Sequence, residues 1–391
     1  MPDVVIVEAV RSPLGKRRGG LSAMHSMNLL ASVQAALIER SGIDPLEIGQ
    51  VVGGCVGQAG MQAMNVTRNA WLSAGLPIGV AATTVDAQCG SSQQAANLAY
   101  ALVASGVVDA AVGCGVESMS QVPMGATIPK DRFVGKPVTK SYWKHHEWTS
   151  QFEAAERIAR QWGITREATD AFGKLSQDRA AAAWADARFA SQLLPIDAPV
   201  PDEDGKPSDE IRRIERDEGL RETTLEGLAA LKTNLPDGVH TAGSSSQISD
   251  GAGAVLLMTR EKAQTLGLTP LATIVDTCLV GSDPALMLTG PIGATQKLLA
   301  DNSLQMSDID VVEINEAFAS VVLAWERELK PDMATVNPNG GAIAVGHPLG
   351  GTGVILLTKA VHELRRSDQE HALVTMCCGG GLGTGTLLRR S

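Results

Sequence analysis

Two cysteines and one histidine occur beside glycines and small residues, where a reactive side chain would be accessible to a ligand. Cys89 lies between a predicted strand and a predicted helix, within 85–92. A cysteine at a helix N-terminus meets the positive end of the helix dipole and unpaired N–H groups, which favour the thiolate. The segment therefore predicts a nucleophile, but a buried, inert cysteine that packs as a small hydrophobe explains it equally well.

His347 lies in the glycine-rich segment 340–353, just before another predicted helix. Histidine accepts a thiol proton or stabilises an oxyanion near neutral pH. A lone histidine is usually structural, but the surrounding glycines let a ligand come close to the backbone. This pattern favours a functional histidine.

Cys377 precedes a second thiol, Cys378, and three consecutive glycines at 379–381. N–H groups that no side chain obstructs can form an oxyanion hole, and a close-packed strand end is the alternative. Asn315 lies in a predicted strand-to-helix turn, where its amide can orient a water molecule. The neighbouring Glu316 is equally well explained as a structural acid at the helix N-terminus.

The elements around these segments predict an α/β fold with two similar halves. In the first half, strands are predicted at 4–9, 51–56, 83–87 and 109–115, and helices at 27–41 and 91–105. In the last part, helices are predicted at 293–300 and 353–365, and strands at 309–314 and 372–377. The patterns repeat at an offset of about 260 positions, which indicates an internal duplication. Ligands in such folds bind beyond the carboxyl ends of strands, so the reactive side chains should share one cavity.

The middle of the chain differs in kind from both halves. It contains most of the tryptophans, two predicted helices at 154–162 and 165–189, and a strongly charged segment at 202–222. A strand at 252–258 should return the chain to the first half. The predicted organisation is therefore a first half at 1–119 plus 247–268, an inserted loop domain at 120–246, and a second half at 269–391.

The composition excludes several classes of protein. The net charge of −10 argues against a nucleic-acid binder, and an anionic ligand would need a local basic patch. No run of 18 apolar residues predicts a membrane span, and no secretory signal or peroxisomal tripeptide is found. The six cysteines lack the Cys-x-x-Cys spacing of zinc sites, so we expect reduced thiols, no bound metal and a cytoplasmic location.

At these segments the chain resembles the thiolase superfamily over nearly its whole length. The blocks that carry the resemblance occur in the family's order, at 8–13, 89–91, 115–120, 315–319, 346–348 and 377–381. The resemblance implies two βαβαβαββ halves in a five-layer αβαβα arrangement with an inserted loop domain. It also implies a homodimer or homotetramer that acts on CoA and 3-ketoacyl-CoA, with CoA as a co-substrate and no permanently bound cofactor.

The resemblance implies a role for each reactive residue. Cys89 would carry the acyl group as a thioester, and His347 would activate it. Cys377 would be the acid and base that acts on the acetyl-CoA carbon. The oxygen of the intermediate would bind the N–H groups of Cys89 and Gly379, and Asn315 would hold a water that completes a second oxyanion hole with His347.

For CoA, the positions that match the family are Arg221, Thr223 and Ser246, with Gln151 as a further candidate. Arg221 would supply the local positive charge that the acidic chain requires. The implied reaction is CoA-dependent cleavage of 3-ketoacyl-CoA to acetyl-CoA or propionyl-CoA and a shortened acyl-CoA. The alternative is the biosynthetic condensation of two acetyl-CoA molecules to acetoacetyl-CoA.

The chain departs from the family pattern at several positions. Ser92 stands where the family usually has glycine, which predicts a tighter turn after the nucleophile. Cys378 directly follows the implied catalytic thiol. The short-chain enzymes' His-Met-Gly segment is absent, and 150–157 stands in its place. This segment, with 86–90 and 244–250, looks most like thiolases of steroid side-chain degradation, which favours a bulky 3-ketoacyl substrate.

Three other functions fit parts of the sequence. A decarboxylating ketoacyl synthase would have histidine where Cys377 stands. A non-catalytic CoA-binding protein would not need the full set of reactive residues. A thiol redox sensor fits poorly, because a disulfide between the adjacent Cys377 and Cys378 would be strained.

Overall fold

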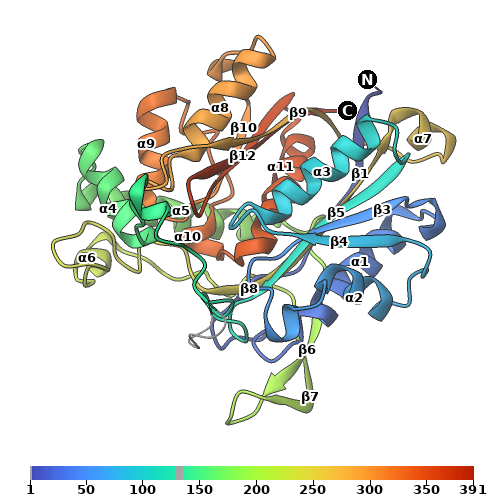
Figure 1. Cartoon of the computed structure of the whole chain (residues 1–391), viewed down its shortest axis with the longest axis horizontal. Helices are drawn as coiled ribbons and strands as arrows, with labels where there is room; N and C mark the ends of the chain where they lie inside the picture. The colour runs from blue at the N-terminus through green and yellow to red at the C-terminus, as the bar shows by residue number, and fades with distance from the viewer. Residues whose placement is uncertain (1, 129–134) are drawn as a thin grey trace.

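The computed structural model describes residues 2–128 and 135–391, and it has the α/β architecture expected from the sequence (Figure 1). One mixed sheet runs through both halves in the order β10-β11-β12-β9-β1-β8-β5-β3-β4, and the short strand β2 pairs with β8. The first half contributes β1 (Val4–Arg11), β2 (Gly15–Lys16), β3 (Gln50–Gly54), β4 (Ala81–Val85), β5 (Ala110–Ser118) and β8 (Ser249–Thr259). The second contributes β9 (Ala272–Gly281), β10 (Val311–Ile314), β11 (His371–Cys378) and β12 (Leu382–Arg390).

The helices alternate with these strands along the chain. The first half contains α1 (Ser26–Ser41), α2 (Val66–Ser73), α3 (Ser91–Ala104) and α7 (Arg260–Thr265). The second half contains α8 (Gly290–Asp301), α9 (Ala319–Leu329), the single-turn α10 (Ala342–Val345) and α11 (Thr352–Ser367). Within the described residues, no helix combines the length and the apolar character needed to cross a bilayer.

The strand pairing repeats between the halves, as the sequence pattern indicated. β3 and β5 are parallel and pair Val51 with Val112, 61 positions apart; β10 and β11 are parallel and pair Val311 with Ala372, also 61 apart. In each half the next pairing is antiparallel, β5 with β8 and β11 with β12. The predicted return of the chain to the first half is confirmed, because β8 pairs with β5 and β1.

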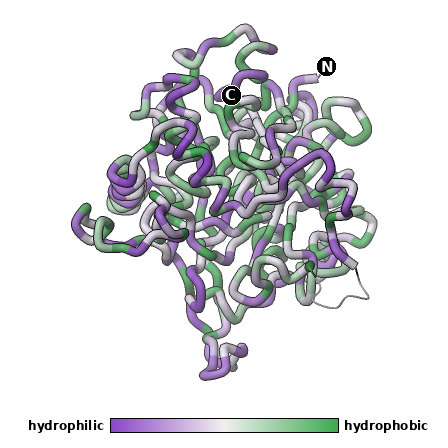
Figure 2. The backbone as a smooth tube through the Cα atoms, turned by 60° about the vertical axis from the view of Figure 1, so that its left-hand side comes forward, coloured by the Kyte–Doolittle hydropathy of each residue, from purple (hydrophilic) through white to green (hydrophobic). Residues whose placement is uncertain are grey.

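The inserted segment enters between β5 and β8, where the second half has only a short glycine turn. It contains α4 (Gln151–Gln161), α5 (Arg166–Ala185), α6 (Leu225–Ala229) and the hairpin of β6 (Ile196–Pro201) and β7 (Pro207–Ile214). The hairpin projects from the body of the molecule (Figure 1), and Figure 2 shows that its tip is hydrophilic. This hairpin accounts for most of the charged segment at 202–222.

Side chains on the two faces of the strands bury different hydrophobic clusters. On β1, Val5 packs with α1 and α2 on the outer face, whereas Ile6 packs with α3 and α11 on the inner face, as the period of two requires. In the second half the outer face is covered by α8 and α9. The strands of the first half and those of the second half therefore form two layers, one on each side of α3 and α11. The order of layers is helix, sheet, helix, sheet, helix, with α3 and α11 in the middle.

The two central helices approach each other closely at their N-terminal ends. A Cβ atom at Gly353 would lie 2.2 Å from the backbone nitrogen of Gln93, so only glycine fits there. One residue further on, the N–H of Val354 donates a hydrogen bond to Ser92 Oγ at 3.1 Å. Ser92 lies within α3 and not in a turn, so the predicted effect of Ser92 on the turn after the nucleophile is wrong.

Candidate active site

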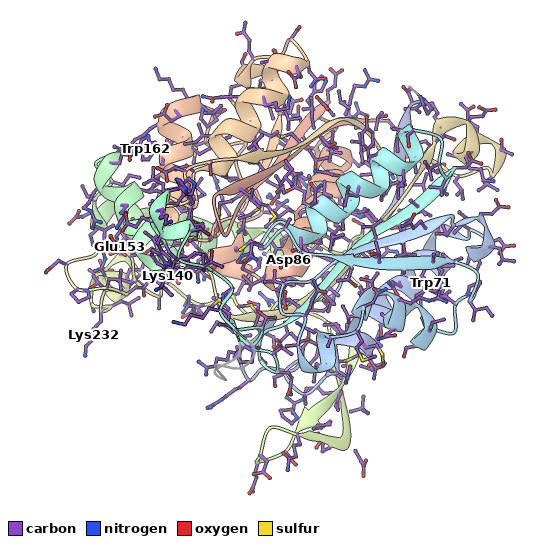
Figure 3. All side chains as sticks on the ribbon, in the orientation of Figure 1. Trp71, Asp86, Lys140, Glu153, Trp162 and Lys232 are labelled. Carbon is purple, nitrogen blue, oxygen red and sulfur yellow. The ribbon has the colours of Figure 1, made fainter. Side chains whose placement is uncertain are left out.

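Cys89 lies in a short turn between β4 and α3 that is closed by its own hydrogen bonds. Gln88 adopts a left-handed conformation with φ of 53°, and Asp86 accepts its N–H at 2.7 Å. Ser91 Oγ accepts the N–H of Ala87 at 3.0 Å and donates to the carbonyl of Gln88. Because the side chain of Asp86 fixes this turn, β4 ends at Val85, two residues earlier than predicted. Figure 3 places Asp86 near the centre of the view, between the two halves.

The surroundings of Cys89 do not favour a thiolate in the free protein. Burial raises the pKa of Cys89 to about 11, although the backbone N–H groups of Gly379 and of Cys89 itself act in the opposite direction. The backbone N–H groups act on this pKa in the direction that the sequence predicted, but desolvation is the larger effect, so the thiolate is not favoured overall. The side chain keeps part of its surface open. The N–H groups of Cys89 and Gly379 both face its sulfur atom.

Cys377 and Cys378 lie on opposite faces of β11. Cys377 packs in a cluster with Met287 and Phe318, and Cys378 packs in the central layer, which Cys89 also contacts. Burial raises the pKa of Cys377 well above its ordinary value, and the charges of Cys89 and Cys378 raise it further. The three sulfur atoms are therefore close enough to influence one another's titration.

Gly90 is explained by packing against this strand and not by access for a substrate, as the sequence suggested. A Cβ atom at Gly90 would lie 2.5 Å from Cys378 Sγ and 2.7 Å from a methyl carbon of Thr384. The turn that follows β11 has positive φ angles at Gly380 and Gly381, 79° and 81°. Glycine at these positions lets β11 reverse into β12 directly beside Cys89.

His347 is buried, and its hydrogen bonds define its tautomer. Nδ1 lies 2.6 Å from Thr352 Oγ1, and that hydroxyl donates to the carbonyl of Pro348 at 3.0 Å. Since the hydroxyl hydrogen is used, Nδ1 must be the protonated nitrogen, which leaves a free lone pair on Nε2. Burial lowers the pKa of His347 to about 4, so the ring is neutral at pH 7.

Asn315 contacts Nε2, the unprotonated nitrogen of this histidine. Asn315 Nδ2 lies 3.4 Å from His347 Nε2, and the Asn315 backbone N–H donates to the carbonyl of Thr375 on β11. Asn315 Oδ1 is buried and has no hydrogen-bond partner among the described residues. An unpaired buried acceptor is costly unless a water or ligand satisfies it, so Asn315 Oδ1 is available to accept a hydrogen bond from one.

Two buried carboxylates hold the segment that carries His347. Glu117 accepts the N–H of Gly350 at 2.9 Å and the N–H of Val56 at 2.9 Å. Glu316 accepts the N–H of Ile343 at 3.1 Å and the hydroxyl of Ser176 at 2.6 Å. Since α9 begins only at Ala319, Glu316 is not an acid at its N-terminus, and it anchors the neighbouring loop.

The sequence did not single out Glu117 or Ser249, which also supports this segment by accepting the N–H of His347 at 3.1 Å. Glu117 lay within a block that resembled the family, at 115–120, and that was the one available signal. Glu117 contacts Val56, 61 positions earlier in the chain, and Gly350, 233 positions later, and only the fold reveals these contacts.

A separate cavity of about 250 Å³ contains two of the four positions expected to bind CoA. Arg221 and Thr223 line it, whereas Ser246 and Gln151 lie outside its lining. Ser246 donates its N–H to the carbonyl of Ala317, and Gln151 lies at the start of α4, where its amide contacts Met124 Sδ at 3.6 Å. The other lining residues are Gln177, Glu222, Thr224, Gly227, Leu228, Leu231 and Gly243.

The side chains offer no evident metal site. Across residues 2–128 and 135–391, no group of three or more His, Cys, Asp and Glu side chains is arranged to hold an ion. All six cysteines are free thiols. The two thiols Cys89 and Cys377, the neutral imidazole of His347 and the backbone N–H groups can supply nucleophilic and acid–base chemistry.

Comparison with known families matches nearly the whole chain. The family description "Thiolase, N-terminal domain" matches residues 4–261, and "Thiolase, C-terminal domain" matches residues 268–390. Among curated proteins, the chain is 41% identical to a steroid 3-ketoacyl-CoA thiolase of Mycobacterium tuberculosis, over 100% of this chain and 95% of that protein. It is 40% identical to a beta-ketoadipyl-CoA thiolase of Acinetobacter baylyi, with both chains fully covered.

A solved structure has the same fold. The crystal structure of the acetyl-CoA acetyltransferase of Bacillus anthracis superposes with a TM-score of 0.91 at 34% sequence identity. The match covers 100% of this chain and 99% of the other. The arrangement of strands and central helices described above is thus shared over the full length of both chains.

Proposed function

The chain belongs to the thiolase family and is an acyltransferase, and we propose that it cleaves 3-ketoacyl-CoA with CoA, through a thioester on Cys89. The products are acetyl-CoA or propionyl-CoA and a shortened acyl-CoA. The observation that supports the proposal is that Cys377 and the Gly379 N–H, at the end of β11, lie close to Cys89, while β11 also accepts the backbone N–H of Asn315, whose side chain contacts His347.

In the first half-reaction the Cys89 thiol gives its proton to His347 Nε2, and the sulfur attacks the 3-keto carbon. The oxygen of this adduct accepts hydrogen bonds from the N–H groups of Cys89 and Gly379. The bond between the second and third carbons then breaks. Its electron pair goes to the departing acetyl-CoA carbon, which takes a proton from Cys377.

In the second half-reaction a new CoA thiol gives its proton to the Cys377 thiolate left by the first half-reaction and attacks the thioester carbon. The bond to Cys89 breaks, its sulfur takes the proton back from His347, and the shortened acyl-CoA leaves. During this step the thioester oxygen binds His347 and a water held by Asn315, whose unpaired Oδ1 supports this role. Two half-reactions with a covalent intermediate predict ping-pong kinetics.

For CoA, we propose the cavity beside α6, with Arg221 and Thr223 as contacts and Ser246 and Gln151 at the approach to the catalytic turns. The exposed guanidinium of Arg221 offers positive charge to a phosphate. The lining leucines, Leu228 and Leu231, offer apolar surface to the pantetheine arm or adenine. Replacing Arg221 with Met would then raise the KM for CoA without a matching loss of kcat.

A bulky acyl group is the substrate class that the site supports best. The relative named for steroid 3-ketoacyl-CoA is 41% identical to this chain over its whole length. Large apolar side chains at the start of the inserted segment are exposed, and Phe152 stacks edge-on against Phe318, which packs with Cys377. The exposed side chains are Met124, Ile128, Trp143, Trp148 and Phe152.

The alternative is a biosynthetic enzyme that condenses two acetyl-CoA molecules. It is favoured by relatives named acetyl-CoA acetyltransferase, such as that of Chromobacterium violaceum at 38% identity. A panel of 3-ketoacyl-CoA substrates, from acetoacetyl-CoA to a steroid side-chain thioester, separates the two. A kcat/KM that rises by at least tenfold toward the bulky substrates supports the degradative role, and activity on acetoacetyl-CoA alone contradicts it.

We also infer a homo-oligomer in the cytoplasm. β4 is the outermost strand of the sheet, and no described strand pairs with its free side. Met64 and Ile78, near this edge in sequence, are 88% and 82% exposed, which suits a contact with a second copy. The six free thiols suit a reducing compartment. Light scattering tests the oligomer, and a monomer at micromolar concentration would contradict it.

A further inference from the structure

A buried ion pair lies behind the turns that carry Asn315 and His347. Lys359 on α11 donates to Glu313 Oε2 at 2.6 Å, and the two side chains are 1% and 0% exposed. Glu313 lies on β10, two residues before Asn315. The ammonium group also donates to the carbonyl of Gly340 at 2.7 Å. The Lys359 side chain thus connects β10, which ends just before Asn315, to the loop that leads to His347.

The loop that contains Gly340 is held by contacts from three elements, and Lys359 provides one of these contacts. On the β10 side, Asn337 accepts the N–H of Ile314 at 2.8 Å. On the α5 side, Gly340 has a φ of 72° and is so close to Ser176 and Ala180 that a Cβ atom would clash. The α11 side is held by Lys359. If this contact is lost, Gly340 can move relative to β10.

Stability alone gives little reason for such a pair. Removing two charges from water is costly, and apolar side chains of similar size are often as stable in the same place. Burial raises the pKa of Glu313 to about 7 even though Lys359 opposes the shift. Glu313 Oε1 has no partner among the described residues, so the carboxylate is not fully satisfied. The pair does define how β10 and the loop at Gly340 are placed relative to each other.

We propose that Lys359 and Glu313 are positioning residues, which set the spacing between Asn315 and His347 and so the direction of the free Nε2 lone pair. The proposal rests on the proposed function, because it assigns His347 and Asn315 to the reaction. The 3.4 Å contact between Asn315 Nδ2 and His347 Nε2 is already long for a hydrogen bond, so a small displacement would break it.

The test is the double variant Lys359→Met/Glu313→Met, which replaces the pair by apolar side chains of similar length. We expect a cooperative thermal transition within a few degrees of the parent, a kcat lower by about 10- to 100-fold, and an unchanged KM for CoA. Alkylation of Cys89 should stay at the parental rate, because that turn belongs to the other half. His362→Gln is the matched control, since His362 is also a polar residue of α11, partly buried, but contacts the carbonyl of Ala9.

A second readout does not depend on activity. In histidine-labelled protein, the ring resonances of His347 are assigned by their loss in His347→Gln, and we expect them to shift in the double variant but not in His362→Gln. A parental kcat with unshifted His347 resonances would overturn the proposal. So would equal losses of kcat, Cys89 alkylation and thermal stability, which indicate general damage. If the parent cleaves no 3-ketoacyl-CoA, the proposed function fails, whereas the resonances still decide whether the pair positions His347.

Discussion

The turns before the two central helices correspond between the halves, but they hold their reactive side chains in different ways. Cys89 comes two residues before α3, in a turn closed by hydrogen bonds of its own residues, such as those of Ser91. His347 comes five residues before α11 and is held from outside, by Ser249 on β8 and, through Gly350, by Glu117 on β5. The nucleophile is thus positioned locally, and the base is positioned by both halves.

The difference indicates how each reactive residue should respond to substitutions elsewhere in the protein. A short, self-contained turn keeps its shape when distant residues are replaced, and Cys89 keeps part of its surface open to substrate. The His347 segment has no such independence, because its N–H groups are bonded to side chains from other strands. Distant substitutions should therefore affect proton transfer before they affect the reactivity of the nucleophile.

The largest effect should come from the local turn itself. Cys89→Ala removes the atom that forms the thioester, so we expect turnover to fall by about 10⁴-fold or more, with an unchanged fold. Steady-state thiolysis and mass spectrometry of the acylated peptide measure it. The matched control is Cys378→Ala, which removes a neighbouring thiol that packs against Gly90 and should retain turnover within a few-fold. Near-normal turnover of Cys89→Ala would mean that Cys89 is not the nucleophile, and the comparison of the nucleophile's turn with the base's turn would then fail.

The sequence was informative about the local turn and much less so about the distant supports. The alternation of strands and helices around Cys89, His347 and Cys377 predicted the two halves, because strand and helix periodicities are local signals. The direction of the Cys89 pKa could not be predicted, since desolvation depends on the packing of β11 against the turn. The supports Glu117, Ser249 and Lys359 were missed because each bonds to a backbone group of another element, 19 to 233 positions away in the chain.

A variant at Cys377 tests whether cleavage of 3-ketoacyl-CoA can be lost while acylation of Cys89 is retained. Cys377→Ala removes the proton donor for the departing carbanion but leaves the Cys89 turn and His347 in place. We expect cleavage of 3-ketoacyl-CoA to fall by about 10²- to 10³-fold, while acetyl-CoA still acylates Cys89. Mass spectrometry of Cys89 after incubation with acetyl-CoA, beside the thiolysis assay, measures both. Loss of acylation together with cleavage would mean that Cys377 also supports the nucleophile.

The pH dependence of Cys89 alkylation tests the local turn without any substrate. Only the thiolate reacts, and with a pKa of about 11 its fraction rises with pH throughout the accessible range. The rate with iodoacetamide should therefore rise by about tenfold per pH unit between pH 7 and pH 9. His347, whose pKa is lowered to about 4, stays neutral in this range and adds no inflection. A plateau below pH 8 would mean that the helix dipole does stabilise the thiolate.

Two serines allow the same deletion to be made in both turns. Ser249→Ala removes the acceptor for the His347 N–H, and Ser91→Ala removes the bonds that close the Cys89 turn. Losing one buried hydrogen bond of about 1 kcal/mol should lower kcat by about 5-fold in Ser249→Ala, with parental alkylation of Cys89. Ser91→Ala should change both quantities. If the two variants show the same pattern, the turns are not held differently.

The smallest effect is expected where the two regions touch. Ser92 Oγ accepts the N–H of Val354 in the first turn of α11, a group that has no acceptor within its own helix. Ser92→Ala should lower the free energy of unfolding by about 1 kcal/mol, as for the loss of a helix cap, and leave kcat within about twofold. Urea denaturation and steady-state kinetics measure the two quantities, with Thr358→Val, also on α11 but bonded only to its own helix, as the control. If Ser92→Ala lowers kcat by more than tenfold at small cost in stability, this single bond relays the position of one turn to the other. The nucleophile and the base would then be set as one unit, because the helices that follow them would move together.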